Sequence, residues 1–113
     1  MPRTPALLAS LAALLTAQAA NAQCFSYYCS DVVIERIYVF PNGPTLLVTS
    51  SDQAPLNCTQ ENGMYLTLDM GQPQSAVMYS FFLAVHLQQK KVMVRIEEGS
   101  QGCKIAYAAS LPG

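Results

Sequence analysis

Four cysteines constrain the fold of this 113-residue chain more than any other feature. They are Cys24, Cys29, Cys58 and Cys103, and all of them follow an apolar leader. An even number of cysteines in a small exported domain is typical of a disulfide framework. The sequence therefore predicts a small domain that two disulfides hold together in addition to its core.

Three pairings of four cysteines are open. We favour Cys24–Cys29, which closes a short local loop, together with Cys58–Cys103, which ties the middle of the chain to its last strand. In the chain-entropy model the longer loop stabilises the fold by about 4 kcal/mol. A zinc site is the alternative, but no two cysteines have two-residue spacing and the chain has one histidine. We expect no metal site and no cofactor.

The leader has the pattern of a secretory signal. Arg3 precedes a run of apolar or small residues over 6–20, and Ala20-Asn21-Ala22 supplies the small residues that signal peptidase requires. The apolar run is shorter than the about 20 residues of a membrane-spanning helix. We predict a signal peptide over 1–22, no membrane span, and one mature domain over 23–113 that is secreted by way of the periplasm.

The charge of the mature domain argues against one class of partner. Six Lys and Arg residues stand against seven Asp and Glu residues, and five basic residues remain once Arg3 leaves with the leader. Nucleic-acid-binding domains carry a basic patch or stripe. The mature domain has none, so we expect no nucleic-acid partner.

The pattern of apolar residues predicts five strands and one helix. The strands are expected over about 32–40, 45–50, 64–69, 92–97 and 103–108, and the helix over 73–89. Asn42-Gly43 between two apolar runs indicates a hairpin. The order β-β-β-α-β-β is that of the OB-fold, a mostly β, five-stranded Greek-key barrel with one helix between strands three and four.

The expected helix is apolar over most of its circumference. One predicted face holds four apolar residues, Val77, Phe81, Ala84 and Val85. Leu83 and Leu87 lie well round the other side, and only the sector near Tyr79 and His86 is polar. Such a helix is usually buried on more than one side. It either contacts another subunit or is sunk in the core of its own domain.

Few residues of this chain are suited to catalysis. His86 is the only histidine, and no serine or cysteine has a matched histidine in a motif. Glu97 and Glu98 are adjacent in a strand end, so their carboxylates point apart. We therefore predict no catalytic residues and a protein that is not an enzyme.

The segment Phe25–Asp31 is a better candidate for a binding site. It contains three aromatic residues, two serines and one carboxylate within seven residues. Aromatic faces cover the apolar face of a sugar ring, and hydroxyl and carboxylate groups bind its hydroxyls. The alternative is that these aromatic side chains fill one end of the barrel.

Two segments resemble a known family. Tyr27-Tyr28-Cys29-Ser30-Asp31 and the strand that follows, through Val39, resemble the start of the B subunit of subtilase cytotoxin. The helix and Lys91-Val92-Met93-Val94-Arg95-Ile96 resemble that subunit's helix and its Val-Arg-Ile strand. The two matches bracket most of the mature chain.

The resemblance implies an OB-fold subunit of an AB-type toxin. Such subunits form a ring of five, bind sialylated glycans on host cells, and carry a separate catalytic A subunit. The family's sialic-acid-binding serine corresponds to Ser30, and Asp31, Tyr27 and Tyr28 are added on chemical grounds. Cys29 stands between Tyr28 and Ser30, where the family pattern has no insertion.

Two functional hypotheses follow. The first is a secreted, glycan-binding B subunit, expected as a homopentamer. The second is a periplasmic or secreted OB-fold protein that binds another protein or a small ligand and has no toxin partner.

Overall fold

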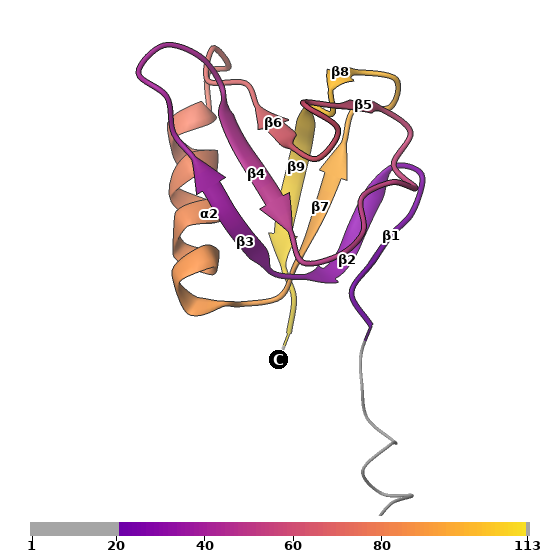
Figure 1. Ribbon diagram of the computed structural model, residues 1–113. Helices are drawn as coiled ribbons and strands as arrows, with labels where there is room; N and C mark the ends of the chain where they lie inside the picture. Colours follow the sequence, from indigo (N-terminus) through magenta and orange to yellow (C-terminus); the bar gives the residue numbers. More distant parts are fainter. Residues whose placement is uncertain (1–20, 113) are drawn as a thin grey trace, which may run out of the picture.

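In this computed structural model, residues 21–112 are described. The predicted signal peptide over 1–22 lies almost wholly outside the described residues. The strands are β1 (Gln23–Cys24), β2 (Tyr28–Val32), β3 (Ile34–Tyr38), β4 (Thr45–Thr49), β5 (Thr59–Gln60), β6 (Leu66–Leu68), β7 (Val92–Ile96), β8 (Gln101–Gly102) and β9 (Ile105–Ser110). The helix is α2 (Ser75–Gln88) (Figure 1).

One bent strand joins the two halves of the barrel. β2 pairs with β7 in one sheet, and β3 pairs with β4 in the other. Val33 separates β2 from β3, and both of its backbone polar groups bond to Ser50, the N–H to the hydroxyl and the C=O to the amide, at 3.0 Å each. The strand can therefore leave one sheet and enter the other without losing backbone hydrogen bonds.

The remaining strand pairs close the barrel. β4 pairs with β6 and β7 pairs with β9, all antiparallel. The closing contact is a parallel bridge between Thr67 and Lys104, where the Thr67 amide donates to the Cys103 carbonyl at 3.0 Å. With β2 and β3 counted as one strand, the order around the barrel is that of the OB-fold. The predicted mostly β fold, with its helix between the third and fourth strands, is confirmed.

The first strand begins earlier than the expected residue 32. Residues 28–31 already form β2, because β1 folds back on them with Cys24 opposite Cys29. The disulfide Cys24–Cys29 closes this turn. The Phe25–Asp31 segment is therefore not a free loop, since its second half lies in a strand.

The third strand is shorter than expected. Leu66 and Leu68 are buried as predicted, but Met64 is 45 % exposed. Asn62 and Gly63 both have left-handed φ values, 50° and 74°, and this turn directs Met64 away from the core.

The core fills the space between the sheets and the helix. β7 alternates as predicted, with Val92, Val94 and Ile96 buried. From α2, Phe82 and Val85 enter this core. The four residues expected on one face of the helix do not share one environment, because Val85 is buried while Val77 and Ala84 are exposed.

The polar sector of the helix, near Tyr79 and His86, faces the barrel. Tyr79 packs partly buried against the core, and His86 Nδ1 lies 2.6 Å from the Ile34 carbonyl oxygen. Nδ1 must carry a proton to donate to that carbonyl. Since Tyr79 and His86 face the barrel, the opposite, solvent-facing side of α2 is apolar.

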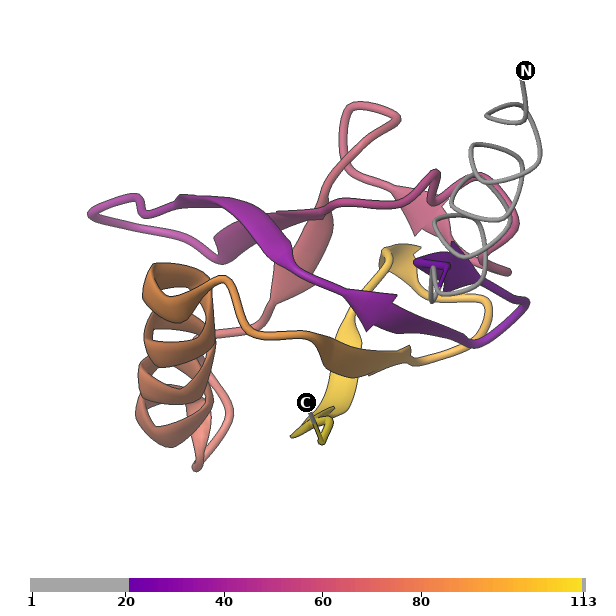
Figure 2. The same ribbon diagram turned by 90° about the horizontal axis from the view of Figure 1, so that it is seen from below.

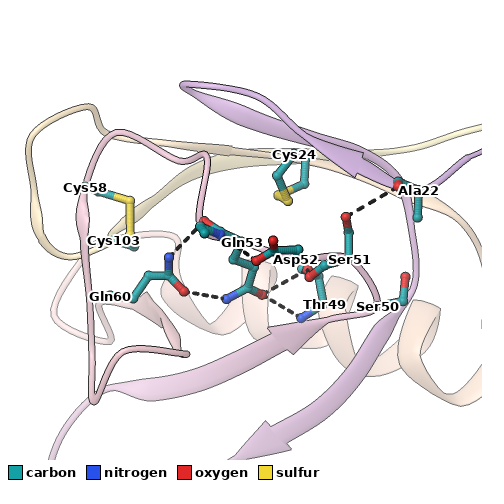
Figure 3. Close-up of a disulfide and its surroundings, with 12 residues drawn as sticks. Ala22, Cys24, Thr49, Ser50, Ser51, Asp52, Gln53, Cys58, Gln60 and Cys103 are labelled. Atoms are coloured by element: carbon teal, nitrogen blue, oxygen red, sulfur yellow. Dashed lines mark hydrogen bonds between the residues drawn. A yellow bond between two sulfur atoms is a disulfide. The ribbon is translucent and has the colours of Figure 1, made fainter.

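The second disulfide, Cys58–Cys103, joins the long loop after β4 to the segment just before β9. It flanks a short parallel pair, β5 with β8, that the sequence did not predict. Figure 3 shows Gln53 beside this region, with its side-chain amide between Thr49 and Gln60. Both disulfides have the pairing expected from the sequence.

Candidate functional site

The aromatic residues of the Phe25–Asp31 segment lie at the surface. Phe25 is 38 % exposed and Tyr27 is 37 % exposed, and neither belongs to the core. The Tyr28 ring stacks on Phe25 with centroids 4.8 Å apart and contacts Tyr27 at 4.9 Å. The alternative that these side chains fill the end of the barrel is wrong for Phe25 and Tyr27.

A tight turn holds these rings outward. The Phe25 amide donates to the Tyr28 carbonyl at 2.7 Å, and the Asn57 amide donates to the Ser26 carbonyl at 2.7 Å. Cys24 and Cys29 are both buried at the base of the turn, where their disulfide closes it. The turn is thus anchored at its base, while the residues between the cysteines project outward.

These tyrosines line a hollow that we call the aromatic pocket. It has a volume of about 220 Å³ and is lined by Tyr27, Tyr28, Met93, Arg95 and Tyr107. The strand register explains why the residues meet, since Tyr28 lies opposite Arg95 and Arg95 lies opposite Tyr107. Side chains opposite one another in antiparallel strands share a face. The aromatic pocket therefore spans three strands on the outer face of one sheet.

Arg95 lies among the rings of this pocket. Its Cζ is 4.6 Å from the centroid of the Tyr27 ring and 5.8 Å from that of Tyr107. Cation–π contacts of this kind hold a guanidinium group over an aromatic face. The pocket therefore combines flat apolar surfaces with one fixed cation.

Ser30 and Asp31 lie at the border of the aromatic pocket rather than among its lining residues. The β2–β7 register shifts between Cys29 and Val32, so both residues face Met93 alone, which is a β-bulge. Asp31 has a left-handed φ of 57°, and the Ser30 hydroxyl donates to its carboxylate at 3.4 Å. Met93 lines the pocket, so Ser30 and Asp31 lie opposite one of its lining residues in the strand register.

Sequence reasoning found two of the five residues that line this pocket. It named Tyr27 and Tyr28 but missed Met93, Arg95 and Tyr107. Met93 and Arg95 alternate along the strand with Val92, Val94 and Ile96, and that alternation was a usable signal. Their meeting with the Tyr27–Tyr28 pair depends on strand register, which no local pattern in the sequence specifies.

A second and larger hollow lies across the barrel opening. Its volume is about 450 Å³, and it is lined by Gly43, Pro44, Thr67, Asp69, Met70, Gly71 and Lys104. Loops equivalent to the β3–β4 loop and the segment before β9 are those with which OB-folds bind ligands. Asp69 already accepts a hydrogen bond from the Gly71 amide at 2.9 Å.

A third cluster is formed by Arg36 and Tyr38 of β3 with Tyr65, which directly precedes β6. Arg36 Nη1 donates to the Tyr38 hydroxyl at 3.2 Å, and the Tyr38 and Tyr65 rings meet edge to face at 5.3 Å. The hydrogen bond from Arg36 lowers the pKa of Tyr38 below its usual range. The hydrogen bond to Tyr38 raises the pKa of Tyr65.

No arrangement for acid–base or metal chemistry is found within residues 21–112. In that part of the chain no three His, Cys, Asp or Glu side chains lie close enough to hold a metal ion. All the cysteines there are in disulfides. His86 is engaged with the Ile34 carbonyl. That the protein is not an enzyme stays a prediction.

The outward side of α2 forms an apolar surface that we call the helix face. Its six residues are Ala76, Val77, Ser80, Leu83, Ala84 and Leu87. Val77 is 62 % exposed and Leu87 is 74 % exposed. The one hydroxyl, on Ser80, donates to the Ala76 carbonyl at 3.0 Å. The face thus presents almost no polar group that is free to bind water.

Comparison with known proteins adds no family to this description, since no family model and no curated protein matches the sequence significantly. Within the described residues, none of the helical structure has the length and apolar character needed to cross a bilayer.

Proposed function

We propose that the mature chain is a secreted, glycan-binding B subunit of an AB-type bacterial toxin, and that it binds sialylated host glycans at the aromatic pocket. The observation that carries this proposal is the position of Tyr27 and Tyr28. They line an open hollow on the outer face of a sheet. A pair of tyrosines at an open pocket suits a sugar ring, whose apolar face stacks on aromatic rings.

The border of the aromatic pocket supports the same ligand class. Ser30 and Asp31 supply a hydroxyl donor and a carboxylate acceptor for the hydroxyl groups of a sugar. Ser30 is also the residue to which the family resemblance assigns contact with sialic acid. The aromatic rings suit the apolar face of a pyranose, and the polar residues Ser30 and Asp31 suit its hydroxyl groups.

The helix face supports assembly into a ring. Contiguous exposed apolar surface marks an interaction site in soluble proteins. α2 lies on the opposite flank of the barrel from β1 and β2 in both views (Figures 1 and 2). Packing of helices around the axis of a homopentamer would therefore leave the aromatic pocket free for glycans, while the ring carries a separate catalytic subunit.

A glycan array probed with the purified mature protein tests the proposal. We expect binding to sialylated glycans that is lost in Tyr27→Ala and weakened at least tenfold in Ser30→Ala. Ser26→Ala is the matched control, because Ser26 is exposed in the same turn but does not line the pocket. Absence of binding to every sialylated glycan would overturn the proposal. Unchanged binding by Ser30→Ala and Tyr27→Ala would overturn the site.

The second candidate function is that of an OB-fold protein that binds a small ligand and has no toxin partner. The larger hollow favours it, because Asp69 and Lys104 supply opposite charges at the place where OB-folds bind their ligands. A screen of small polar ligands by thermal shift distinguishes the two. Stabilisation that Lys104→Ala abolishes and Tyr27→Ala retains would favour this candidate over the toxin subunit.

A further inference from the structure

The cation in the aromatic pocket retains its capacity for hydrogen bonding. Arg95 contacts Tyr27 and Tyr107 through the faces of their rings. A guanidinium group carries five N–H donors, and all of them lie in its own plane. A cation–π contact is made by the charge or the flat face of the guanidinium group. It does not supply an oxygen acceptor for the N–H donors. The donors are thus available to a ligand.

The other lining residues set the charge and polarity of the pocket. Tyr27, Tyr28, Met93 and Tyr107 are uncharged near neutral pH, so Arg95 is the only charged residue among the five that line the hollow. Arg95 is half-buried, and Met93 beside it adds apolar surface. A cation surrounded by apolar atoms attracts an anion more strongly than one in open water, because the local dielectric constant is lower.

The contacts of Arg95 also fix its position. Rings from residues on both neighbouring strands flank it, Tyr27 before β2 and Tyr107 in β9. A guanidinium group held in this way loses less side-chain entropy when it forms a paired contact with a carboxylate. The arrangement is that of a preorganised site for a planar oxyanion.

We propose that Arg95 is the residue that selects acidic ligands, by binding a sugar carboxylate through paired N–H···O bonds while the tyrosine rings cover the sugar. This proposal rests on the proposed function. It adds Arg95 to the binding site and requires that the bound sugar carry a negative charge. The volume of about 220 Å³ is below the roughly 300–1,000 Å³ of pockets for drug-sized ligands. The pocket therefore takes one terminal acidic sugar, and the rest of the glycan lies outside it.

A simpler role for Arg95 is structural, as a side chain that fills the gap between two tyrosines. The two roles differ in one measurable respect. A structural arginine affects stability and leaves the preference for charged ligands unchanged. A carboxylate-binding arginine makes binding depend on the charge of the sugar.

Isothermal titration of the mature protein with three probes separates these roles. The probes are sialyllactose, its carboxylate methyl ester and lactose. The variants are Arg95→Gln, which removes the charge, and Arg95→Lys, which keeps the charge without the planar fork. Arg36→Gln is the matched control, because Arg36 is also an arginine beside a tyrosine but is exposed and lies outside the pocket. Thermal unfolding of each variant confirms that it is folded.

We expect the wild type and Arg36→Gln to bind sialyllactose at least tenfold more tightly than the methyl ester, as the loss of a charge-assisted hydrogen bond predicts. Arg95→Gln should bind both probes equally weakly, and Arg95→Lys should lie between. If Arg95→Gln binds sialyllactose as tightly as the wild type, or if the wild type binds acid and ester alike, the assignment of Arg95 is overturned while glycan binding stands. If the wild type binds none of the probes and no glycan on the array, both proposals fall.

Discussion

At the scale of single residues, Gln53 is the polar side chain on which the long loop after β4 depends. It is 6 % exposed, and its Oε1 accepts from the Thr49 amide at 2.8 Å and from the Thr49 hydroxyl at 2.9 Å. Its Nε2 donates to the Gln60 side chain at 3.0 Å and to the Met64 carbonyl at 2.7 Å. The side-chain amide of Gln53 thus forms hydrogen bonds both to β4 and to the loop that follows it (Figure 3).

Truncation of this amide should destabilise the fold. Gln53→Ala leaves the Thr49 amide and the Met64 carbonyl without their partners, and each unsatisfied buried group costs about 1–3 kcal/mol. We expect a loss of about 3 kcal/mol in the free energy of unfolding, measured by denaturant titration. Gln72→Ala, at an exposed glutamine, should change it by less than about 0.5 kcal/mol. Equal effects of the two substitutions would contradict this account of the loop.

Tyr38 should be the first tyrosine to ionise as the pH rises. Its hydroxyl accepts a hydrogen bond from Arg36, which favours the phenolate and lowers its pKa. Absorbance of phenolate in an alkaline titration should therefore show an early step that disappears in Tyr38→Phe. In Arg36→Gln the step should move to higher pH. A titration curve that neither substitution changes would show that the contact does not persist in solution.

The site also shows which residue-level features a sequence can predict. Aromatic and hydroxyl residues next to a disulfide were enough to identify Tyr27 and Tyr28, because the candidates are neighbours in the chain. Arg95 and Tyr107 reach the pocket through the pairing of β2, β7 and β9. That pairing adjoins a β-bulge at Ser30 and Asp31, where Asp31 has a left-handed φ of 57° although it is not a glycine.

Among the elements of the fold, α2 is the one with an apolar composition on a side that faces solvent. No charged residue occurs within it, and its exposed side includes Val77, Leu83 and Leu87. Its apolar character over most of the circumference was evident from the sequence, but the side that faces the barrel was left open. With apolar residues on nearly every side, periodicity cannot decide which side faces the barrel. Phe82 and the His86–Ile34 contact decide it instead.

A negative charge on the helix face should prevent assembly. If α2 packs against other copies in a ring, Leu87→Glu buries an unpaired carboxylate there, at a cost of several kcal/mol. Light scattering should show a ring of about five copies for the wild type and a monomer for the variant. Gln101→Glu adds the same charge at an exposed position in β8 and should leave the ring intact. A monomeric wild type at micromolar concentration would contradict the assembly.

The helix also ends in a way that the sequence did not indicate. Gln89 adopts a left-handed φ of 50°, and the amides of Gln89 and Lys90 donate to the carbonyls of His86 and Val85 at 3.2 Å and 3.0 Å. This position usually holds glycine. The helix therefore stops one residue before the expected end.

At the scale of the whole molecule, the two disulfides differ in the length of chain that they close. Cys58 and Cys103 are 45 residues apart in sequence, and Cys24 and Cys29 are 5 apart. Loop-closure entropy gives about 4 kcal/mol for the longer loop and about 2 kcal/mol for the shorter one. The pairing could be favoured from the sequence because one bridge closes a short local loop and the other ties the middle of the chain to its last strand.

Removing the two disulfides one at a time should show that one contributes more to stability and the other more to glycan binding. The pair Cys58→Ala and Cys103→Ala should lower the free energy of unfolding more than the pair Cys24→Ala and Cys29→Ala. For glycan binding the order should reverse, because Cys24–Cys29 closes the turn that holds Tyr27 and Tyr28 at the aromatic pocket. Denaturant titration and the glycan array measure the two effects. A larger binding loss without Cys58–Cys103, in protein that remains folded, would contradict this division.

The fold as a whole leaves two exposed surfaces that its own packing does not explain, the aromatic pocket and the helix face. α2 lies on the opposite flank of the barrel from β1 and β2 (Figures 1 and 2). The OB-type order was predictable, since five strand-like segments with a helix between the third and the fourth are in the order of that fold. The pocket was predictable only in part, since it draws on three strands.

The most direct test of the central claim is chemical-shift mapping of the mature protein titrated with sialyllactose. The account predicts amide shifts that cluster at Tyr27–Ser30, Met93–Arg95 and Tyr107, with small changes elsewhere. Shifts that cluster instead at Thr67–Gly71 and Lys104, around the larger hollow, would contradict the assignment of the binding site. An unchanged spectrum at millimolar sialyllactose would contradict sialylated-glycan binding itself.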